Sequence, residues 1–131
     1  MLRIKILKPF LIILFSVIVN SVFSQEITCT NPICKFGFVT EGDTLLFSYE
    51  LKNTGDKSLI ISNYEVECGC TTMEQVNNAI EPGESYIVKV KFDTHEKYDR
   101  QDRTVKLISN AKNSSVVLRF KGVVLKKKKK D

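Results

Sequence analysis

The sequence predicts an all-β protein, an antiparallel sandwich of about seven strands that follows a cleavable signal peptide. Three observations favour this fold. Apolar and polar residues alternate with a period of two along most of the chain after residue 24. Turn-forming residues, such as Asn53-Thr54-Gly55-Asp56 and Pro82-Gly83, separate the alternating stretches. No window in this part keeps the 3.6-residue period of a helix over several turns.

The N-terminus has the features of a secretory signal peptide. The basic residues Arg3, Lys5 and Lys8 precede an apolar run over 10–19, and small residues follow over 22–24 at the offset of a cleavage site. The apolar run is shorter than the roughly 20 residues of a transmembrane helix, so we expect cleavage rather than an N-terminal anchor. The predicted location is therefore outside the cytosol, periplasmic or secreted.

Cleavage would define the domain organisation. Residues 1–24 form the signal peptide, 25–34 an N-terminal segment with two cysteines, 35–125 the sandwich domain, and 126–131 a basic disordered tail. The 107 residues that remain after cleavage (131 less 24) are enough for one small domain with one core.

The charge of the folded body excludes one class of partner. Residues 25–125 hold 12 basic and 14 acidic residues, a net charge of −2, so the positive charge of the full chain comes from its two ends. A body of this charge has no basic field that would attract nucleic acid. A weak contact with an anionic surface stays open for the terminal lysines. These are Lys126, Lys127, Lys128, Lys129 and Lys130.

Each predicted strand rests on local alternation. The first long one places Leu45, Phe47, Tyr49 and Leu51 on one face, with mostly polar residues between them. Residues 73–80 are expected to hold at most one helical turn. The predicted strands, in chain order, are 45–51, 59–66, 86–92, 104–108, 116–120 and 123–125.

A sandwich of such strands is immunoglobulin-like, although this chain has neither a Trp nor the widely spaced cysteine pair of antibody domains. Its core is expected to contain the apolar residues that share the inner faces. These are Phe36, Phe38, Leu45, Phe47, Tyr49, Leu51, Ile60, Val66, Tyr86, Val88, Val90, Phe92, Val105, Leu107, Val116, Leu118 and Phe120.

A series of short motifs covers residues 35–125. They are Phe36-Gly37-Phe38, 49–55, 59–61, Val66-Glu67-Cys68-Gly69-Cys70-Thr71, Ile80-Glu81-Pro82-Gly83-Glu84, 88–93, 108–110 and 118–124. In this order they resemble the bacterial DUF1573 family, small exported domains with an immunoglobulin-like, major-sperm-protein-like sandwich. The Cys-Gly-Cys-Thr step followed by Pro-Gly is the most specific part. The function of that family is unknown, so the resemblance implies fold and export but no activity.

The cysteines are the most informative candidate site residues. They are Cys29, Cys34, Cys68 and Cys70. An even count in a small exported domain favours disulfides, and all three pairings of four cysteines stay open. Asn31-Pro32 favours a turn that would bring the first two together. On a flat strand the last two would lie about 6.5–7 Å apart, at the limit for a bridge, but Gly69 allows a bend that would close it.

The Cys68-Gly69-Cys70 segment also supports an alternative. Two thiolates beside a glycine hinge suit thiol exchange or a soft metal such as Cu(I) or Zn(II). Further ligands are few, because His95 is the only histidine and Met73 one of few soft donors. His95 also stands in the polar run 93–103, which is expected to be a solvated loop. We therefore predict no firm metal or cofactor ligand.

No enzyme motif is present. The chain has no Gly-rich phosphate loop, no Gly-x-Ser-x-Gly elbow and no His-Glu-x-x-His. The preferred hypothesis is a non-enzymatic interaction or structural module of the bacterial cell envelope, with an unknown protein partner. The alternative is a thiol-redox or Cu(I)-binding protein that uses Cys68 and Cys70.

Overall fold

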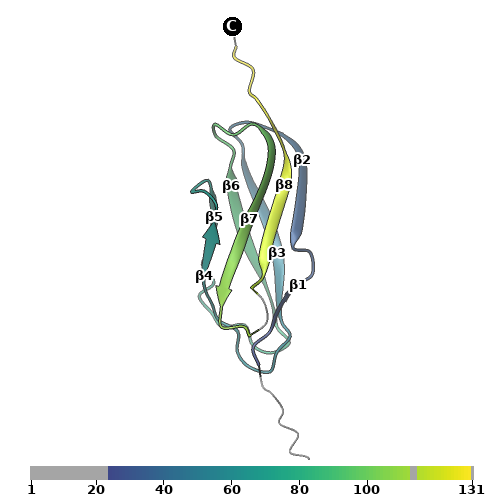
Figure 1. Ribbon diagram of the computed structural model, residues 1–131, viewed down its shortest axis with the longest axis vertical. Helices are drawn as coiled ribbons and strands as arrows, with labels where there is room; N and C mark the ends of the chain where they lie inside the picture. The colour runs from purple at the N-terminus through teal and green to yellow at the C-terminus, as the bar shows by residue number, and fades with distance from the viewer. Residues whose placement is uncertain (1–23, 113–114, 131) are drawn as a thin grey trace, which may run out of the picture.

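The computed structural model describes residues 24–112 and 115–130, and it confirms the all-β fold class. Two four-stranded sheets pack against each other as a sandwich (Figure 1). The first sheet contains, in spatial order, β1 (Ile27–Cys29), β3 (Thr44–Asn53), β6 (Ser85–Asp93) and β5 (Thr71–Met73). The second contains β2 (Ile33–Thr40), β8 (Val117–Leu125), β7 (Asp99–Ser109) and β4 (Ile61–Val66). The predicted signal peptide lies outside the described residues, apart from Ser24.

The number and direction of the strands differ from the prediction in two respects. The eight strands include β1 and β5, which have three residues each and are too short to show alternation. The pair β2–β8 is parallel, whereas every other strand pair is antiparallel. The chain leaves β1 in the first sheet, crosses at Asn31-Pro32, and enters the second sheet in the direction of β8. The expected boundary between the N-terminal segment and the domain, at residue 35, therefore falls inside β2.

No helix with the length and apolar character of a membrane span occurs in residues 24–112 and 115–130. The stretch 73–80, where one helical turn was allowed, has no helix and begins with the last residue of β5. The polar run 93–103 is only partly a loop. β7 starts at Asp99, so residues 99–103 of this run belong to a strand, and only the connection around His95 is irregular.

Alternation predicts the inner faces of the long strands correctly. Phe47, Tyr49 and Leu51 of β3 are buried, as are Val88, Val90 and Phe92 of β6. The predicted core omits several apolar residues that the structure buries, most of them in short or irregular segments. These are Ile27, Leu59, Ile61, Met73, Val76, Ile80 and Val124.

Ile60, a predicted core residue, is exposed. Leu59 forms an isolated antiparallel bridge with Ile80, with backbone hydrogen bonds of 2.9 and 2.8 Å. Leu59 and Ile61 on either side of it are buried, so the alternation places Ile60 on the solvent side, where 52% of it is accessible.

Phe38 is the second predicted core residue that is exposed, and a β-bulge explains it. The register of β2 against β8 shifts between Lys35 and Gly37, and Gly37 adopts a left-handed φ of 67°. The extra residue lets Phe36 point into the core while it turns Phe38 to the outer face. Phe38 is consequently 74% exposed.

Phe36 belongs to a cluster of four phenylalanines that joins the two sheets. Ring centroids lie 5.8 Å apart for Phe36–Phe47, 6.4 Å for Phe36–Phe92, 4.8 Å for Phe47–Phe120 and 5.0 Å for Phe92–Phe120. Gly122 of β8 leaves room for this arrangement, because a Cβ atom at that position would lie only 2.4 Å from the Phe36 ring. The cluster draws two rings from each sheet.

Asn53 organises the turn that follows β3. Its side chain is fully buried and donates hydrogen bonds to the carbonyls of Lys57 (2.7 Å) and Ile80 (2.8 Å). Its Oδ1 accepts a third hydrogen bond, from the backbone N–H of Gly55 (2.9 Å). The turn chemistry expected at 53–56 is thus confirmed, and Asn53 also fixes the distant segment before β6.

The contact between Gly122 and Phe36 generates a prediction about stability. We expect Gly122→Ala to lower the free energy of unfolding by about 1–3 kcal/mol, because the added methyl group displaces the Phe36 ring. Urea denaturation measures the change. Gly69→Ala is the matched control, since a Cβ there meets no atom within 4 Å. Equal stability of the two variants would contradict the packing described.

Candidate functional site

Cys68 and Cys70 form a disulfide in the structure. They stand in the turn between β4 and β5, where the backbone N–H of Thr71 donates to the Cys68 carbonyl (3.2 Å). The bend brings their Cα atoms to 5.3 Å, inside the usual range for a bridge, whereas a flat strand would hold them further apart. Gly69 at the apex has open space where a side chain would be. Both cysteines are half-buried.

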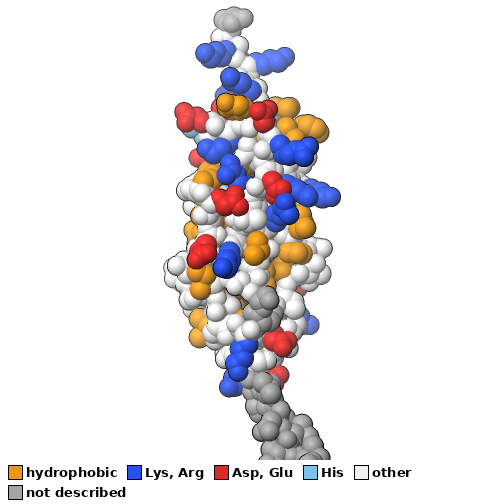
Figure 2. All heavy atoms as spheres, viewed as in Figure 1, with side chains coloured by type: hydrophobic (Ala, Val, Ile, Leu, Met, Phe, Trp, Pro, Cys, Tyr) orange, Lys and Arg blue, Asp and Glu red, His pale blue; other side chains and the backbone are white. Residues whose placement is uncertain are grey.

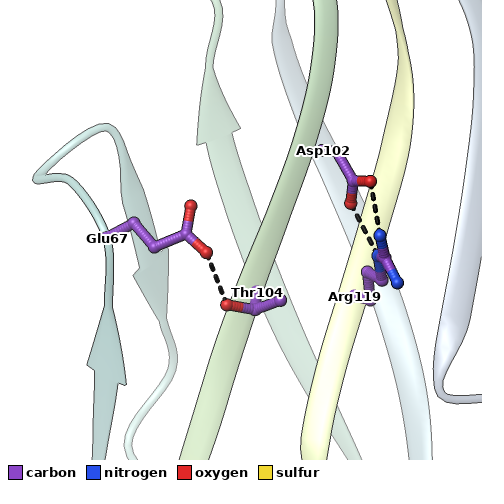
Figure 3. Close-up of polar contacts among 4 residues, drawn as sticks. All are labelled: Glu67, Asp102, Thr104 and Arg119. Carbon is purple, nitrogen blue, oxygen red and sulfur yellow. Dashed lines mark hydrogen bonds and ion pairs between the residues drawn. The ribbon is translucent and has the colours of Figure 1, made fainter.

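Two hydrogen bonds hold the bridge against the second and first sheets. Glu67, next to Cys68, accepts a hydrogen bond from the Thr104 hydroxyl of β7 at 2.6 Å (Figure 3). The Cys70 carbonyl accepts one from the backbone N–H of Asp93 (2.9 Å). The disulfide therefore sits at the end of the sandwich where β5 and β6 meet the loop after β4. The bridge therefore links two half-buried residues of a single turn and does not join distant segments of the chain.

The other donors considered for a metal do not gather around this bridge. Met73 is buried in the core, and His95 stands in an exposed loop. Across residues 24–112 and 115–130, no group of three or more His, Cys, Asp or Glu side chains is placed to hold a metal ion. The Cu(I) and Zn(II) alternative therefore gains no further ligand from the described part of the chain.

Cys29 and Cys34 are free thiols in the structure. Cys29 ends β1 and Cys34 lies in β2, so they belong to different sheets, and both pack against the core. Burial raises the pKa of Cys29, and the nearby Cys34 adds to the shift. Burial and a hydrogen bond with Cys34 raise the pKa of Tyr49, whose hydroxyl donates to the Arg119 carbonyl at 2.7 Å.

Both shifts have the same sign and the same consequence. The folded protein favours the protonated forms of Cys29 and Tyr49. Their contribution to stability is therefore complete below the ordinary pKa of each group and is lost as the pH rises through the folded value. Cys29 is therefore not an activated nucleophile, because a raised pKa lowers the fraction of the thiol that is present as thiolate.

The outer face of the second sheet carries interspersed charges of both signs, over β7 and β8 (Figure 2). Asp102 of β7 and Arg119 of β8 form a bidentate ion pair on this face (Figure 3). Arg119 Nε donates to Asp102 Oδ1 at 2.6 Å, and Arg119 Nη2 donates to Asp102 Oδ2 at 2.5 Å. The hydrogen bond from Arg119 lowers the pKa of Asp102, and the positive fields of Lys121 and Arg100 lower it further. Asp102 thus stays ionised and compensates one nearby cation.

A shallow hollow of about 380 Å³ lies next to this ion pair. Its lining includes Gly37 and Gly122, which have no side chains, and the exposed Phe38. Three cations and one anion line it, together with Gln101 and Val123. The charged lining residues are Lys35, Arg100, Lys121 and Asp102.

Sequence reasoning did not identify this hollow. Phe38 was placed in the core, and Arg100 in a loop. The available signal was Gly37 inside an alternating segment, because an isolated glycine in a strand often marks a bulge. A bulge reverses the face of every residue that follows it, so Phe38 would then have been placed outside.

The terminal lysines leave the sandwich at the end of β8. Lys126 to Lys130 are exposed and belong to no strand. Two of them contact the body, since the Lys126 ammonium lies 5.5 Å from the centroid of the Tyr98 ring and the Lys127 backbone N–H donates to Glu41 at 3.2 Å. The expected contact of this tail with an anionic surface remains a prediction.

The cysteine arrangement makes a prediction about thiol reactivity. Without reductant, we expect two thiols to be alkylated, Cys29 and Cys34, and after reduction four. Cys29 is expected to react slowly until the pH exceeds the ordinary pKa of a thiol, because burial holds it protonated. Peptide mapping by mass spectrometry identifies the labelled positions. Labelling of Cys68 or Cys70 before reduction, or of neither Cys29 nor Cys34, would contradict the assignment.

Comparisons with known proteins place this geometry in context. No curated protein matches the sequence. Among solved structures, a protein of unknown function from Porphyromonas gingivalis W83 is 15% identical, with a TM-score of 0.66 over 81% of this chain and 50% of that chain, so this chain spans about half its length. The human CEP192 ASH/PapD-like domain 7 is 12% identical, with a TM-score of 0.61 over 80% of this chain and 89% of that chain.

A third structure is the MSP-domain-like protein SSP-19 from Caenorhabditis elegans. It is 10% identical, with a TM-score of 0.56 over 73% of this chain and 98% of that chain. At these identities the similarity shows the fold alone, an immunoglobulin-like sandwich of the PapD and MSP kind. Residues 27–124 match the family described as protein of unknown function (DUF1573). The chain therefore belongs to the DUF1573 family.

Proposed function

We propose that this chain is a non-enzymatic interaction module of the bacterial cell envelope, which binds a protein partner through strand β2. The observation that supports the proposal most directly is the position of β2. It has eight residues, lies at the edge of its sheet, and pairs on one side only, with β8 (Figure 1). An exposed strand edge of this length can accept a strand from another chain.

The backbone of β2 offers hydrogen-bonding groups on its free side. The N–H of Arg119 donates to the Pro32 carbonyl at 2.7 Å, which fixes the pairing pattern with β8. In a parallel pair, alternate residues direct both backbone groups to the neighbour, and the residues between direct theirs away. Ile33 and Lys35 therefore present their backbone groups outward, on the side of β2 where no other described strand of the sheet lies.

The other sheet edges fit a partner strand less well. β1 and β5 have three residues each, which leaves little backbone to pair. β4 has six residues, but Ser62, Asn63 and Glu65 are its exposed side chains. β2 instead exposes two large apolar residues, Ile33 (47%) and Phe38. Apolar side chains beside an open edge favour protein contact over hydration.

The described titratable groups support a non-enzymatic role. The pKa values of four described groups are shifted, and each has a structural cause. Burial in the core accounts for Cys29 and Tyr49, while Asp102 and Arg119 pair with each other on the surface. None of the four is a nucleophile paired with a neighbouring general base, which is the arrangement that covalent catalysis needs.

A second candidate function, thiol redox, rests on the Cys68–Cys70 bridge. The bridge is half-buried and links the two residues that flank Gly69 in a turn. A reductant can therefore reach it more easily than a disulfide in the core. A thiol-redox protein would lose its activity in a Cys68→Ser, Cys70→Ser double variant. An interaction module would retain its partner in the same variant.

Site-specific photocrosslinking in the native bacterium tests the proposal. We expect a photoreactive residue at Phe38 to give one defined protein adduct in the envelope fraction, because this position lies beside the edge that the partner covers. The matched control is Ile87 on the outer face of the first sheet, which is 58% exposed but distant from β2. Adducts that are the same at both positions, no adduct at Phe38, or a cytosolic location would contradict the proposal.

A further inference from the structure

We propose that the free edge of β2 pairs with an acidic peptide segment, which extends the second sheet as a strand and directs acidic and apolar side chains over Lys35 and Phe38, toward the hollow. The inference rests on the proposed function and names the chemistry of the partner. It is carried by three features of β2 and the strands next to it: a bulge that exposes an aromatic ring, a group of cations that form no ion pair, and an unpaired strand edge.

The bulge supplies the apolar anchor. Burial of a large aromatic side chain stabilises a sandwich core, yet the bulge between Lys35 and Gly37 turns Phe38 into solvent. Its register partner on β8 is Val123, whose side chain lines the same hollow. An exposed aromatic residue beside a shallow hollow with an apolar wall is the typical form of a binding hot spot.

The cations supply the charge selectivity. Lys35, Arg100 and Lys121 line the hollow, and no carboxylate within residues 24–112 and 115–130 forms an ion pair with any of them. Asp102 is the one acidic lining residue, and Arg119 already engages both of its oxygens. The lining therefore has a net charge of +2, from three cations and one anion. The charge complement is an acidic ligand.

The strand edge distinguishes a peptide from other acidic ligands. Backbone groups of Ile33 and Lys35 point away from β8, toward the free side of β2, and Lys35 is the cation that stands on this edge strand. A peptide strand can pair with these groups, whereas a phospholipid head group or an acidic polysaccharide lacks the matching N–H and C=O ladder. In an added strand, every second side chain would lie on the outer face beside Lys35 and Phe38. The fitting sequence has acidic and apolar residues on that face.

Titration with synthetic peptides tests the inference. The probe is an acetylated, amidated hexapeptide in which Glu occupies most outward positions and one Phe occupies the remaining one. The counterpart has Lys in place of every Glu. We expect only the acidic peptide to bind the purified full chain, with an affinity that falls as salt rises, because its charges are exposed to solvent.

Two substitutions locate the binding site. Lys35→Glu and Phe38→Ala are each expected to weaken binding of the acidic peptide by at least about tenfold. Lys106→Glu is the matched control for charge, since Lys106 lies on the outer face of β7, opposite Glu65 and outside the hollow. Ile87→Ala is the control for an exposed apolar side chain on the other sheet. Both controls should bind as the unmodified protein does.

Three outcomes would overturn the inference. They are equal binding of the acidic and basic peptides, equal loss of affinity in Lys35→Glu and Lys106→Glu, and binding of phosphatidylglycerol vesicles or polyglutamate that Phe38→Ala leaves unchanged. Failure of the peptide titration together with a defined adduct at Phe38 would reject the acidic chemistry and keep the interaction module. Absence of the adduct would reject the proposed function itself.

Discussion

The insertion of Phe36 between the sheets, opposite Gly122, is the contact on which the rest of this structure depends. The four phenylalanine rings join strands from both sheets, and their close approach needs a position on β8 without a Cβ atom. The chain reaches this packing through an extra residue, Phe36, between Lys35 and Gly37, and Gly37 adopts the left-handed φ that follows at low cost. The residue that completes the core therefore also decides which side chain faces the solvent after it.

This constraint links the core to the surface. Phe38 cannot share the inner face with Phe36 once the bulge is present, so its aromatic side chain lies on the outer face of the second sheet, where it lines the same hollow as the cations. The parallel pairing of β2 with β8 leaves the other side of β2 open. The cysteines have separate places: one pair closes a turn at the end of β4, and the other remains as thiols in β1 and β2.

Much of the fold follows from the sequence, and the misses have physical causes. Period-two alternation predicts β3 and β6 correctly because each is buried on one face along its whole length. It fails where the register changes, at the bulge before Phe38 and at the shift between Ile61 and Asn63, which leaves Ile60 on the outer face. It also misses β5, since three residues are too few to show a pattern.

The candidate site was predictable only in part. The Cys-Gly-Cys spacing indicated that a bend could close a bridge, and the structure places Cys68 and Cys70 in such a bend. The hollow at β2 combines residues from three strands that are far apart in the sequence, and no local pattern in the chain predicts that they lie together. The cations of the hollow lie in segments where polar and apolar residues alternate as in any strand. They come together only through the register between β2, β8 and β7.

Intrinsic fluorescence tests the central claim most directly, because the chain contains no Trp and Phe38→Trp would introduce a single reporter. The bulge predicts that the folded variant emits at the wavelength of the urea-unfolded chain and that acrylamide quenches it to nearly the same extent. Emission shifted to the blue, with protection from acrylamide, would place residue 38 in the core and contradict the bulge.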